Sequence, residues 1–557
     1  MQLHSCQSLL QHARHLRNPV WRNVAPRSRT ITPRAMATAV AEAPTSVDIK
    51  KSYEVVASKL KELSALQGID GLLGWDQMTM MPAGAAASRG AQKAALAGVL
   101  YDKRTDVELG SLLKGLTAAL GGGSSSQDEL GPWARAVVRD AYKDYVKATA
   151  IPKDLAQRIA RLETDAYEGW VEARKASDFS KFAPYLQEWV DVSKEKAAHI
   201  NPAGAVYDVL LDDYEKGMTS ARLDEVFTAV MDGLKPLIAA IKAKGAASVD
   251  DSCVNGSFDV DKQAALCKQV ALDIGFSLEH GRLDVSVHPF TGGTHPTDVR
   301  MTTRFKENNV MEGLTGAVHE TGHALYEQGR NLEYDGLPVN AALSMGVHES
   351  QSLLWERMVA LSPAFCKYLL PKLQEFFPDK FAGVTAEQLY AAINKVMDPS
   401  YIRVESDEVT YPMHVIIRYE IEKGLLEGSI KVEDVPKEWN SRMEQYLGCT
   451  PPSDAQGCLQ DVHWSMGALG YFPTYTLGAM YATQIYNKAA SEIPDLEDLI
   501  ASGNFKPLKE WLNEKVHKLG SLHSSGDELM VAVTGDRLQP SVLLQMLEKK
   551  YSALYKL

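Results

Sequence analysis

Apolar residues recur at helical spacing through most of the chain. Three or four positions separate them, and charged residues lie between them, in five long segments at residues 53–66, 130–147, 154–175, 223–244 and 261–274. This spacing gathers the apolar side chains on one face of an α-helix. Segments with the alternating pattern of strands are few, so we predict a mainly α-helical protein.

One segment has a different pattern. Residues 288–293, His-Pro-Phe-Thr-Gly-Gly, predict a turn, and residues 299–305 have the composition of a short strand. We therefore expect one small antiparallel β-sheet between residues 283 and 305. A strand at this place can pair its backbone with an extended peptide.

The helical stretch 317–326 carries two histidines, in the sequence Ala-Val-His-Glu-Thr-Gly-His-Ala-Leu-Tyr. In a helix, His319 and His323 project from one face, one turn apart, at the spacing that lets two imidazoles bind one cation. Glu320 lies beside them and could take a proton from a metal-bound water. Chance spacing on a solvated helix is the alternative, so the interpretation requires a third ligand.

A catalytic zinc ion takes three protein ligands and leaves a fourth position for water. The segment 345–361 has helical apolar spacing and offers Glu349. Residues 329–338, between the two helices, are rich in Gly, Asn and Asp, which predicts a chain reversal. We expect His319, His323 and Glu349 to hold Zn²⁺, with Co²⁺ as the alternative metal.

Further motifs accompany this pattern in a definite order along the chain. They are residues 72–82, His-Pro-Phe at 288–290, Asp-Val-Arg-Met-Thr at 298–302, His-Glu-Ser-Gln at 348–351, Ile-Arg-Val-Glu-Ser-Asp at 402–407 and Gly-Cys-Leu-Gln-Asp-Val-His-Trp at 457–464. Together they resemble the carboxypeptidase Taq family of zinc metallocarboxypeptidases, from about residue 53 to the C-terminus. Ser406 departs from the family, which has alanine there. The resemblance implies a large, mainly helical, gluzincin-like metallopeptidase with a deep cleft, Glu349 as third ligand, and a homodimer.

A carboxypeptidase must bind the free α-carboxylate of its substrate. The planar guanidinium of arginine does so with two parallel hydrogen bonds. Arg300, Arg403 and Arg418 are the candidates, and the resemblance favours Arg403; a salt bridge with Asp298 or another acid is the alternative role for Arg300. For Arg418, in a helical run, an ion pair with Glu422 one turn away is the simpler interpretation.

The reaction expected from these residues is zinc-dependent removal of the C-terminal residue from peptides with a free C-terminus. Glu320 acts as general base, and Tyr411 or His463 donates a hydrogen bond to the oxyanion. Packing is the alternative role for Tyr411, and a polar network for His463. A zinc oligopeptidase or endopeptidase would use the same ligands without a carboxylate anchor. A non-enzymatic, metal-stabilised scaffold that binds peptides would not need Glu320.

The first residues differ in composition from the rest. Residues 1–41 contain six arginines and no acidic residue, which is typical of an organellar transit peptide, and we expect this segment to be disordered. Composition favours the chloroplast, with the mitochondrion as alternative. The Gly- and Ser-rich segment 121–128 is too short to separate domains, so we expect residues 42–557 to form a single catalytic domain.

Charge and cysteine content narrow the choice of partners. The chain has 59 basic and 71 acidic residues; six of the basic ones precede residue 42, which leaves 53 against 71, a net charge of −18. This balance argues against nucleic acid and anionic membranes as partners. No apolar run reaches the length of a membrane span. The six cysteines are scattered without a Cys-x-x-Cys pair, which is typical of a reducing compartment.

Overall fold

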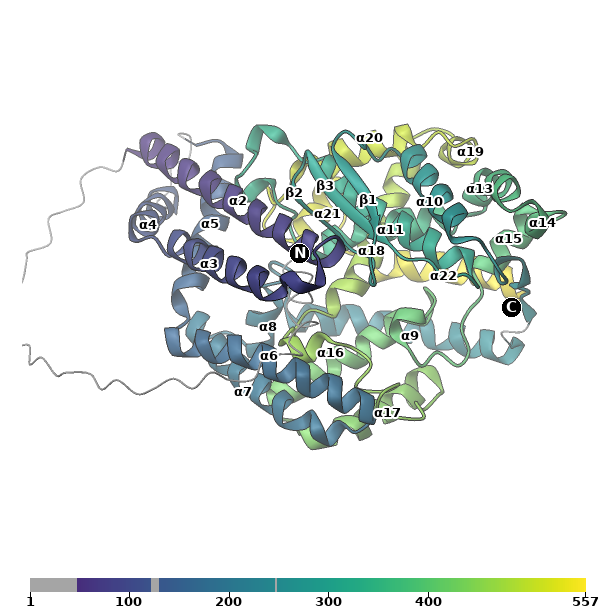
Figure 1. The fold of residues 1–557 in the computed structure, drawn as a ribbon, viewed down its shortest axis with the longest axis horizontal. Coiled ribbons are helices and arrows are strands. Elements are labelled where there is room, and N and C mark those ends of the chain that lie inside the picture. The colour runs from purple at the N-terminus through teal and green to yellow at the C-terminus, as the bar shows by residue number, and fades with distance from the viewer. Residues whose placement is uncertain (1–47, 122–129, 246–247) are drawn as a thin grey trace, which may run out of the picture.

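The computed structural model describes residues 48–121, 130–245 and 248–557 (Figure 1). The expected leader, residues 1–41, and nearly all of the Gly- and Ser-rich segment 121–128 lie outside these ranges. The described chain is mainly α-helical, as predicted. None of its helices is both long enough and apolar enough to cross a membrane.

The five helices predicted from periodicity are present: α2 (Ile49–Thr79), α5 (Pro132–Ala150), α6 (Lys153–Ala176), α9 (Ser220–Lys244) and α10 (Val260–Ile274). Capping side chains fix several starts, because Asp48, Thr219 and Asp259 each accept a hydrogen bond from the backbone N–H three residues further on. The other helices are α3 (Ala86–Arg104), α4 (Val107–Gly121), α7 (Ala183–Ile200), α8 (Val206–Leu211), α11 (Val310–Gln328), α12 (Met345–Leu353), α13 (Pro363–Phe376), α14 (Pro378–Phe381), α15 (Ala386–Ile393), α16 (Tyr411–Glu427), α17 (Val435–Leu447), α18 (Pro473–Glu492), α19 (Leu496–Ala501), α20 (Lys506–Lys515), α21 (Gly526–Thr534) and α22 (Pro540–Tyr555).

The small sheet has three strands, β1 (Gly281–Val285), β2 (Thr291–His295) and β3 (Asp298–Thr303), in the order β1-β3-β2. The predicted strand at 299–305 is therefore confirmed, but the prediction of a purely antiparallel sheet is wrong. β2 and β3 form an antiparallel hairpin, whereas β1 pairs with β3 in parallel. The hairpin joins the sheet through β3, its second strand, and this places two strands of the same direction side by side.

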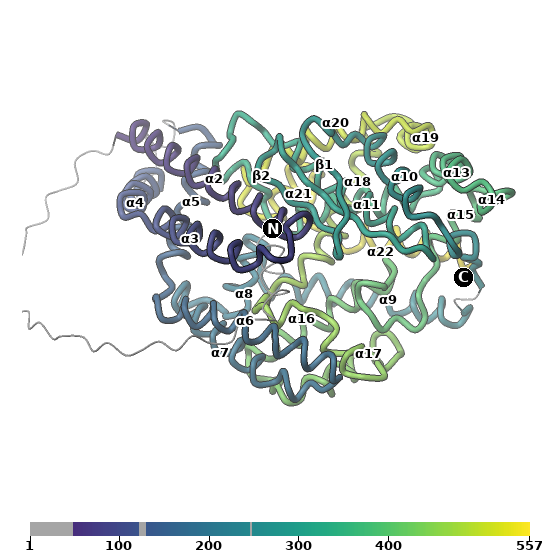
Figure 2. Tube along the Cα trace, viewed as in Figure 1, coloured from purple at the N-terminus to yellow at the C-terminus, as the bar shows by residue number. Residues whose placement is uncertain are grey.

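The sheet lies between two helices, because β2 contacts α2 and β3 contacts α11 (Figure 1). Gly68 and Gly71 of α2 allow the close contact, since a Cβ at either position would come within 2.8 Å of a carbonyl oxygen of β2. Helices α2, α4 and α5 surround a smaller apolar core of their own at one end of the molecule (Figure 2), while a larger core extends through the remaining helices.

Helix α12 is tightly packed between α11 and α18. A Cβ at Gly322 of α11 would lie 2.6 Å from Cα of Ser352, and one at Gly478 of α18 would lie 2.8 Å from Cγ of Glu349. The start of α12 is held by the fully buried Glu215, whose carboxylate accepts hydrogen bonds from Ser344 Oγ, Gly346 N and Tyr481 OH, each at 3.0 Å. These contacts leave α12 little freedom to shift.

This packing gives a testable prediction. Gly322→Ala should lower the free energy of unfolding by about 1–3 kcal/mol, because the new methyl group pushes α12 away from α11. Thermal unfolding measures the loss. The control is Gly90→Ala in α3, where a Cβ meets no atom within 4 Å; this change should be neutral or stabilise by up to about 1 kcal/mol. Equal effects of the two substitutions would contradict the prediction.

Candidate metal centre

The structure brings His319, His323 and Glu349 together. α11 presents both histidines, and α12 presents Glu349. One nitrogen or oxygen atom from each side chain lies within 4.8 Å of the other two. Glu349 Oε2 is 3.4 Å from His323 Nε2 and 3.9 Å from His319 Nε2. The chain reversal expected between the two helices is therefore present, and it places the three side chains as a set of metal donors.

The other ring nitrogens of the two histidines are held by neighbours that the sequence did not reveal. His319 Nδ1 lies 2.6 Å from Glu356 Oε2. His323 Nδ1 lies 2.6 Å from His348 Nδ1, and His348 Nε2 in turn lies 2.9 Å from Glu327 Oε1. Both Nε2 atoms are thus left for a cation. Two imidazoles and one carboxylate, oriented by such hydrogen bonds, fit a divalent metal ion.

The charges of the ligands agree with this fit. Burial, together with His348 and His319, lowers the pKa of His323 to about 3, which keeps its ring neutral. Burial alone would raise the pKa of Glu349, but His319 and His323 hold it at about 2. Burial would also lower the pKa of His319, yet Glu349 and Glu356 raise it to about 10. Of the two histidines, His319 is therefore the one that the neighbouring carboxylates keep protonated in the absence of a metal.

Glu320 is buried beside this set. Thr291, the first residue of β2, donates a hydrogen bond from Oγ1 to Glu320 Oε2 at 2.5 Å. Burial raises the pKa of Glu320 to about 7, even though His319 and Thr291 act in the opposite direction. A carboxyl group that titrates near neutral pH can both accept and return a proton.

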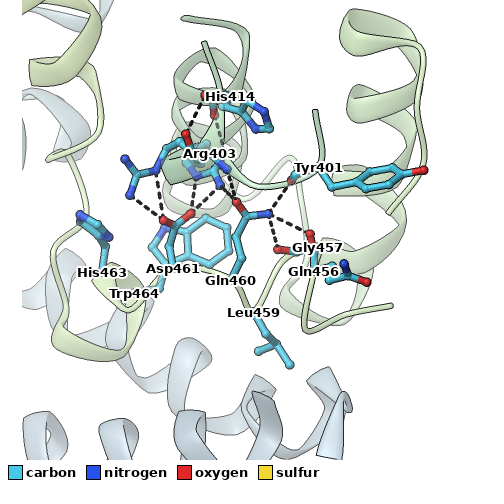
Figure 3. A network of polar contacts seen from close by, with 12 residues as sticks. Tyr401, Arg403, His414, Gln456, Gly457, Leu459, Gln460, Asp461, His463 and Trp464 are labelled. Atoms are coloured by element: carbon cyan, nitrogen blue, oxygen red, sulfur yellow. Dashed lines mark hydrogen bonds and ion pairs between the residues drawn. The ribbon is translucent and has the colours of Figure 1, made fainter. Parts of the chain in front are cut away.

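A second cluster joins the 402–407 and 457–464 motifs (Figure 3). Arg403 donates from Nε and Nη2 to Asp461 Oδ1, at 3.0 and 2.7 Å, and from Nη1 to Tyr411 OH at 2.8 Å. Arg418 donates to Asp461 Oδ2 at 2.6 Å and to Gln460 Oε1 at 2.8 Å. The expected pair between Arg418 and the nearby Glu422 is therefore wrong.

The reason is that Glu422 already has three other donors. Trp464 Nε1, Gly470 N and Tyr207 OH donate to its carboxylate at 2.8, 3.0 and 3.1 Å. These contacts come from the segment that follows Asp461 and from α8. The ion-pair partner of Arg418 is therefore Asp461, from a loop, and not Glu422, which the helical spacing had favoured.

The remaining candidates lie in different surroundings. Arg300 donates from Nε and Nη2 to Asp298, at 2.8 and 2.9 Å, and its guanidinium lies 4.6 Å from the Trp75 ring, so it forms the salt bridge named as its alternative. His463 Nε2 lies 3.2 Å from Tyr475 OH. Burial raises the pKa of both Tyr411 and Tyr475, and the charge of Glu349 adds to the rise.

A helix-borne His-Glu-x-x-His with a glutamate from a following helix as third donor defines a gluzincin-like metallopeptidase centre. The chain belongs to the carboxypeptidase Taq (M32) metallopeptidase family, whose model matches residues 55–551. It is 39% identical to thermostable carboxypeptidase 1 of Thermus thermophilus, over 90% of this chain and 99% of that protein. Carboxypeptidase 1 of Bacillus subtilis is 36% identical, over 89% and 97%.

Solved structures agree with this assignment. The crystal structure of an M32 carboxypeptidase from Deinococcus radiodurans matches with a TM-score of 0.86 and 37% identity, over 91% of this chain and all of that one. A metallocarboxypeptidase from Trypanosoma cruzi matches with a TM-score of 0.85 and 36% identity, over 90% and 99%. The family and the helical fold that the motifs indicated are therefore confirmed.

The partner of His319 gives the second prediction. Glu356→Gln should weaken metal binding by about 10–100-fold, because the amide no longer orients the imidazole with a full negative charge. Competition with a metal chelator measures the affinity. Glu433→Gln removes a carboxylate whose side chain is 76% exposed, and it should leave the affinity unchanged. Equal affinities of the Glu356→Gln variant and the unaltered protein would show that the hydrogen bond does not support the metal.

Proposed function

We propose that this protein removes the C-terminal residue from peptides with a free C-terminus, with Zn²⁺ as its metal and Co²⁺ as the alternative. The observation that carries the proposal is the set of three donors, His319, His323 and Glu349, within 4.8 Å of one another beside the buried Glu320. When bound there, a divalent cation lowers the pKa of a water molecule and polarises the peptide carbonyl.

The residues around the donors supply the proton transfers. Glu320 accepts the proton of the attacking water and returns it to the leaving amine, and burial, which raises the pKa of its carboxyl group, favours the return of a proton taken up. Thr291 holds one carboxylate oxygen of Glu320 by its 2.5 Å hydrogen bond, so the group keeps its orientation. Tyr411 and His463 are proposed as the donors to the oxyanion.

Arg403 is proposed as the anchor for the substrate carboxylate, and Arg300, whose guanidinium pairs with Asp298, is the second candidate. The cluster around Arg403 contains two guanidinium groups and one carboxylate, Asp461. Burial, together with the charge of Arg403, lowers the pKa of Arg418 to about 10. The two guanidinium groups share this one carboxylate as their ion-pair partner, and the α-carboxylate of a peptide would add a second anion.

A pair of peptides that differ only in a free or an amidated C-terminus tests the proposal. The zinc-loaded protein should release single residues from the free acid and leave the amide intact. Glu320→Gln should reduce cleavage by about 10²–10⁴-fold while the protein keeps its metal, because only the proton acceptor is lost. Mass spectrometry follows the products, and metal analysis provides the control.

Other outcomes would assign another function. Cleavage of both peptides at internal bonds would indicate a zinc oligopeptidase or endopeptidase. Binding of both peptides without cleavage by the zinc-loaded protein would indicate the non-enzymatic scaffold. Full activity of Glu320→Gln would remove Glu320 from the mechanism.

Two further proposals concern location and assembly. Six arginines and no acidic residue in residues 1–41 support import into the chloroplast, with the mitochondrion as alternative. Fusion of residues 1–41 to a fluorescent protein tests this proposal by the location of the fusion protein in plant cells.

The second proposal is that the protein forms a homodimer, and it rests on the resemblance to the family. Light scattering tests it by comparing the mass in solution with the 61.2 kDa of one chain.

A further inference from the structure

Arg357 lies next to the metal donors. It belongs to a π-helical turn, Leu354–Ala360, that directly follows α12, and the preceding residue, Glu356, contacts His319. Its guanidinium carbon is 5.0 Å from the centre of the Tyr411 ring. The positive charge of Arg357 acts on the carboxylates of Glu349 and Glu356 and on the Tyr411 phenol. The guanidinium therefore faces the metal centre, and π-helical turns often occur at functional sites.

Arg357 differs from the other arginines of the site in its contacts. Arg403 and Arg418 share Asp461, and Arg300 pairs with Asp298. Within residues 48–121, 130–245 and 248–557, no hydrogen bond or ion pair reaches the guanidinium of Arg357, although the residue is half-buried. Its five N–H donors are available to a ligand.

We propose that Arg357 binds the α-carboxylate of the substrate together with Arg403. The inference rests on the proposed removal of C-terminal residues. Both guanidinium carbons lie close to one ring, at 5.0 and 5.7 Å from the centre of Tyr411, so Tyr411 is a neighbour that the two cations share. A carboxylate can accept about four hydrogen bonds, and two arginines can share it. Arg357 forms no ion pair with a carboxylate in the described part of the chain, so it gains most from this anion.

Replacement of the side chain tests the proposal. With peptides that end in a free carboxylate, Arg357→Met should raise KM by about 10–100-fold with kcat nearly unchanged, because the lost contact is equally strong in the ground and transition states. The rise should be the same for peptides that end in Leu, Lys or Glu. The KM of the Arg357→Lys variant should lie between those of the unaltered enzyme and Arg357→Met, since an ammonium group keeps the charge but lacks the planar pair of donors. Arg158→Met, which removes an exposed arginine paired with Glu195, should change nothing.

Direct binding provides a readout without turnover. In the zinc-loaded Glu320→Gln protein, calorimetry should show the same 10–100-fold loss of affinity for the free-acid peptide when Arg357→Met is added, at equal metal content.

An unchanged KM and an unchanged affinity would overturn the proposal. A loss of affinity confined to peptides that end in Asp or Glu would also overturn it, since Arg357 would then bind a side chain. If the unaltered enzyme cleaves amidated peptides equally well, the proposed function itself fails; if it requires the free acid and Arg357→Met does not matter, only this inference fails.

Discussion

The close approach of α12 to α11 and α18 is the constraint on which the site depends. Three donors must lie within a few ångströms, and two come from α11 while the third comes from α12. Gly322 and Gly478 allow this distance, because any larger residue would meet Ser352 or Glu349. Glu215 also restrains α12 along the helix axis. Its carboxylate binds the N-terminus of α12, where the helix dipole favours negative charge. Packing and this buried carboxylate therefore fix the position of the helix pair.

Charge explains why this position is suited to a cation. Glu320, Glu349 and Glu356 gather around two histidines in a buried region, and burial makes each uncompensated carboxylate costly. Without a metal, His319 carries the compensating proton, with a pKa of about 10. A divalent cation held by His319, His323 and Glu349 would supply this positive charge in place of the proton, with the two Nε2 atoms as donors. The hydrogen bonds of Glu356 and His348 hold the two imidazole rings in place.

Local patterns were sufficient to predict the helices, the family and the three side chains that lie together as possible metal donors. HExxH spacing is a property of one helix, and the chain reversal at 329–338 is encoded in adjacent residues, so both could be inferred from the sequence. Contacts between distant segments could not be inferred from the sequence. The pair of Arg418 and Asp461 joins residues 43 apart in the sequence, and spacing alone favoured Glu422. The parallel partner of β3 was missed for the same reason, since strand direction depends on the edge at which a hairpin docks.

The region around His319 and the region around Asp461 carry net charges of opposite sign, so they favour ligands of opposite charge. Carboxylates exceed fixed cations near His319, which favours a metal ion. Around Asp461, guanidinium groups exceed carboxylates, which favours an anion. Tyr411 lies between the two regions, because its hydroxyl accepts a hydrogen bond from Arg403 and its phenol responds to the charge of Glu349. A peptide C-terminus carries its carboxylate one residue beyond the last peptide bond. A cation-binding region beside an anion-binding region therefore matches the last peptide bond and the terminal carboxylate, the two groups that a carboxypeptidase must hold at once.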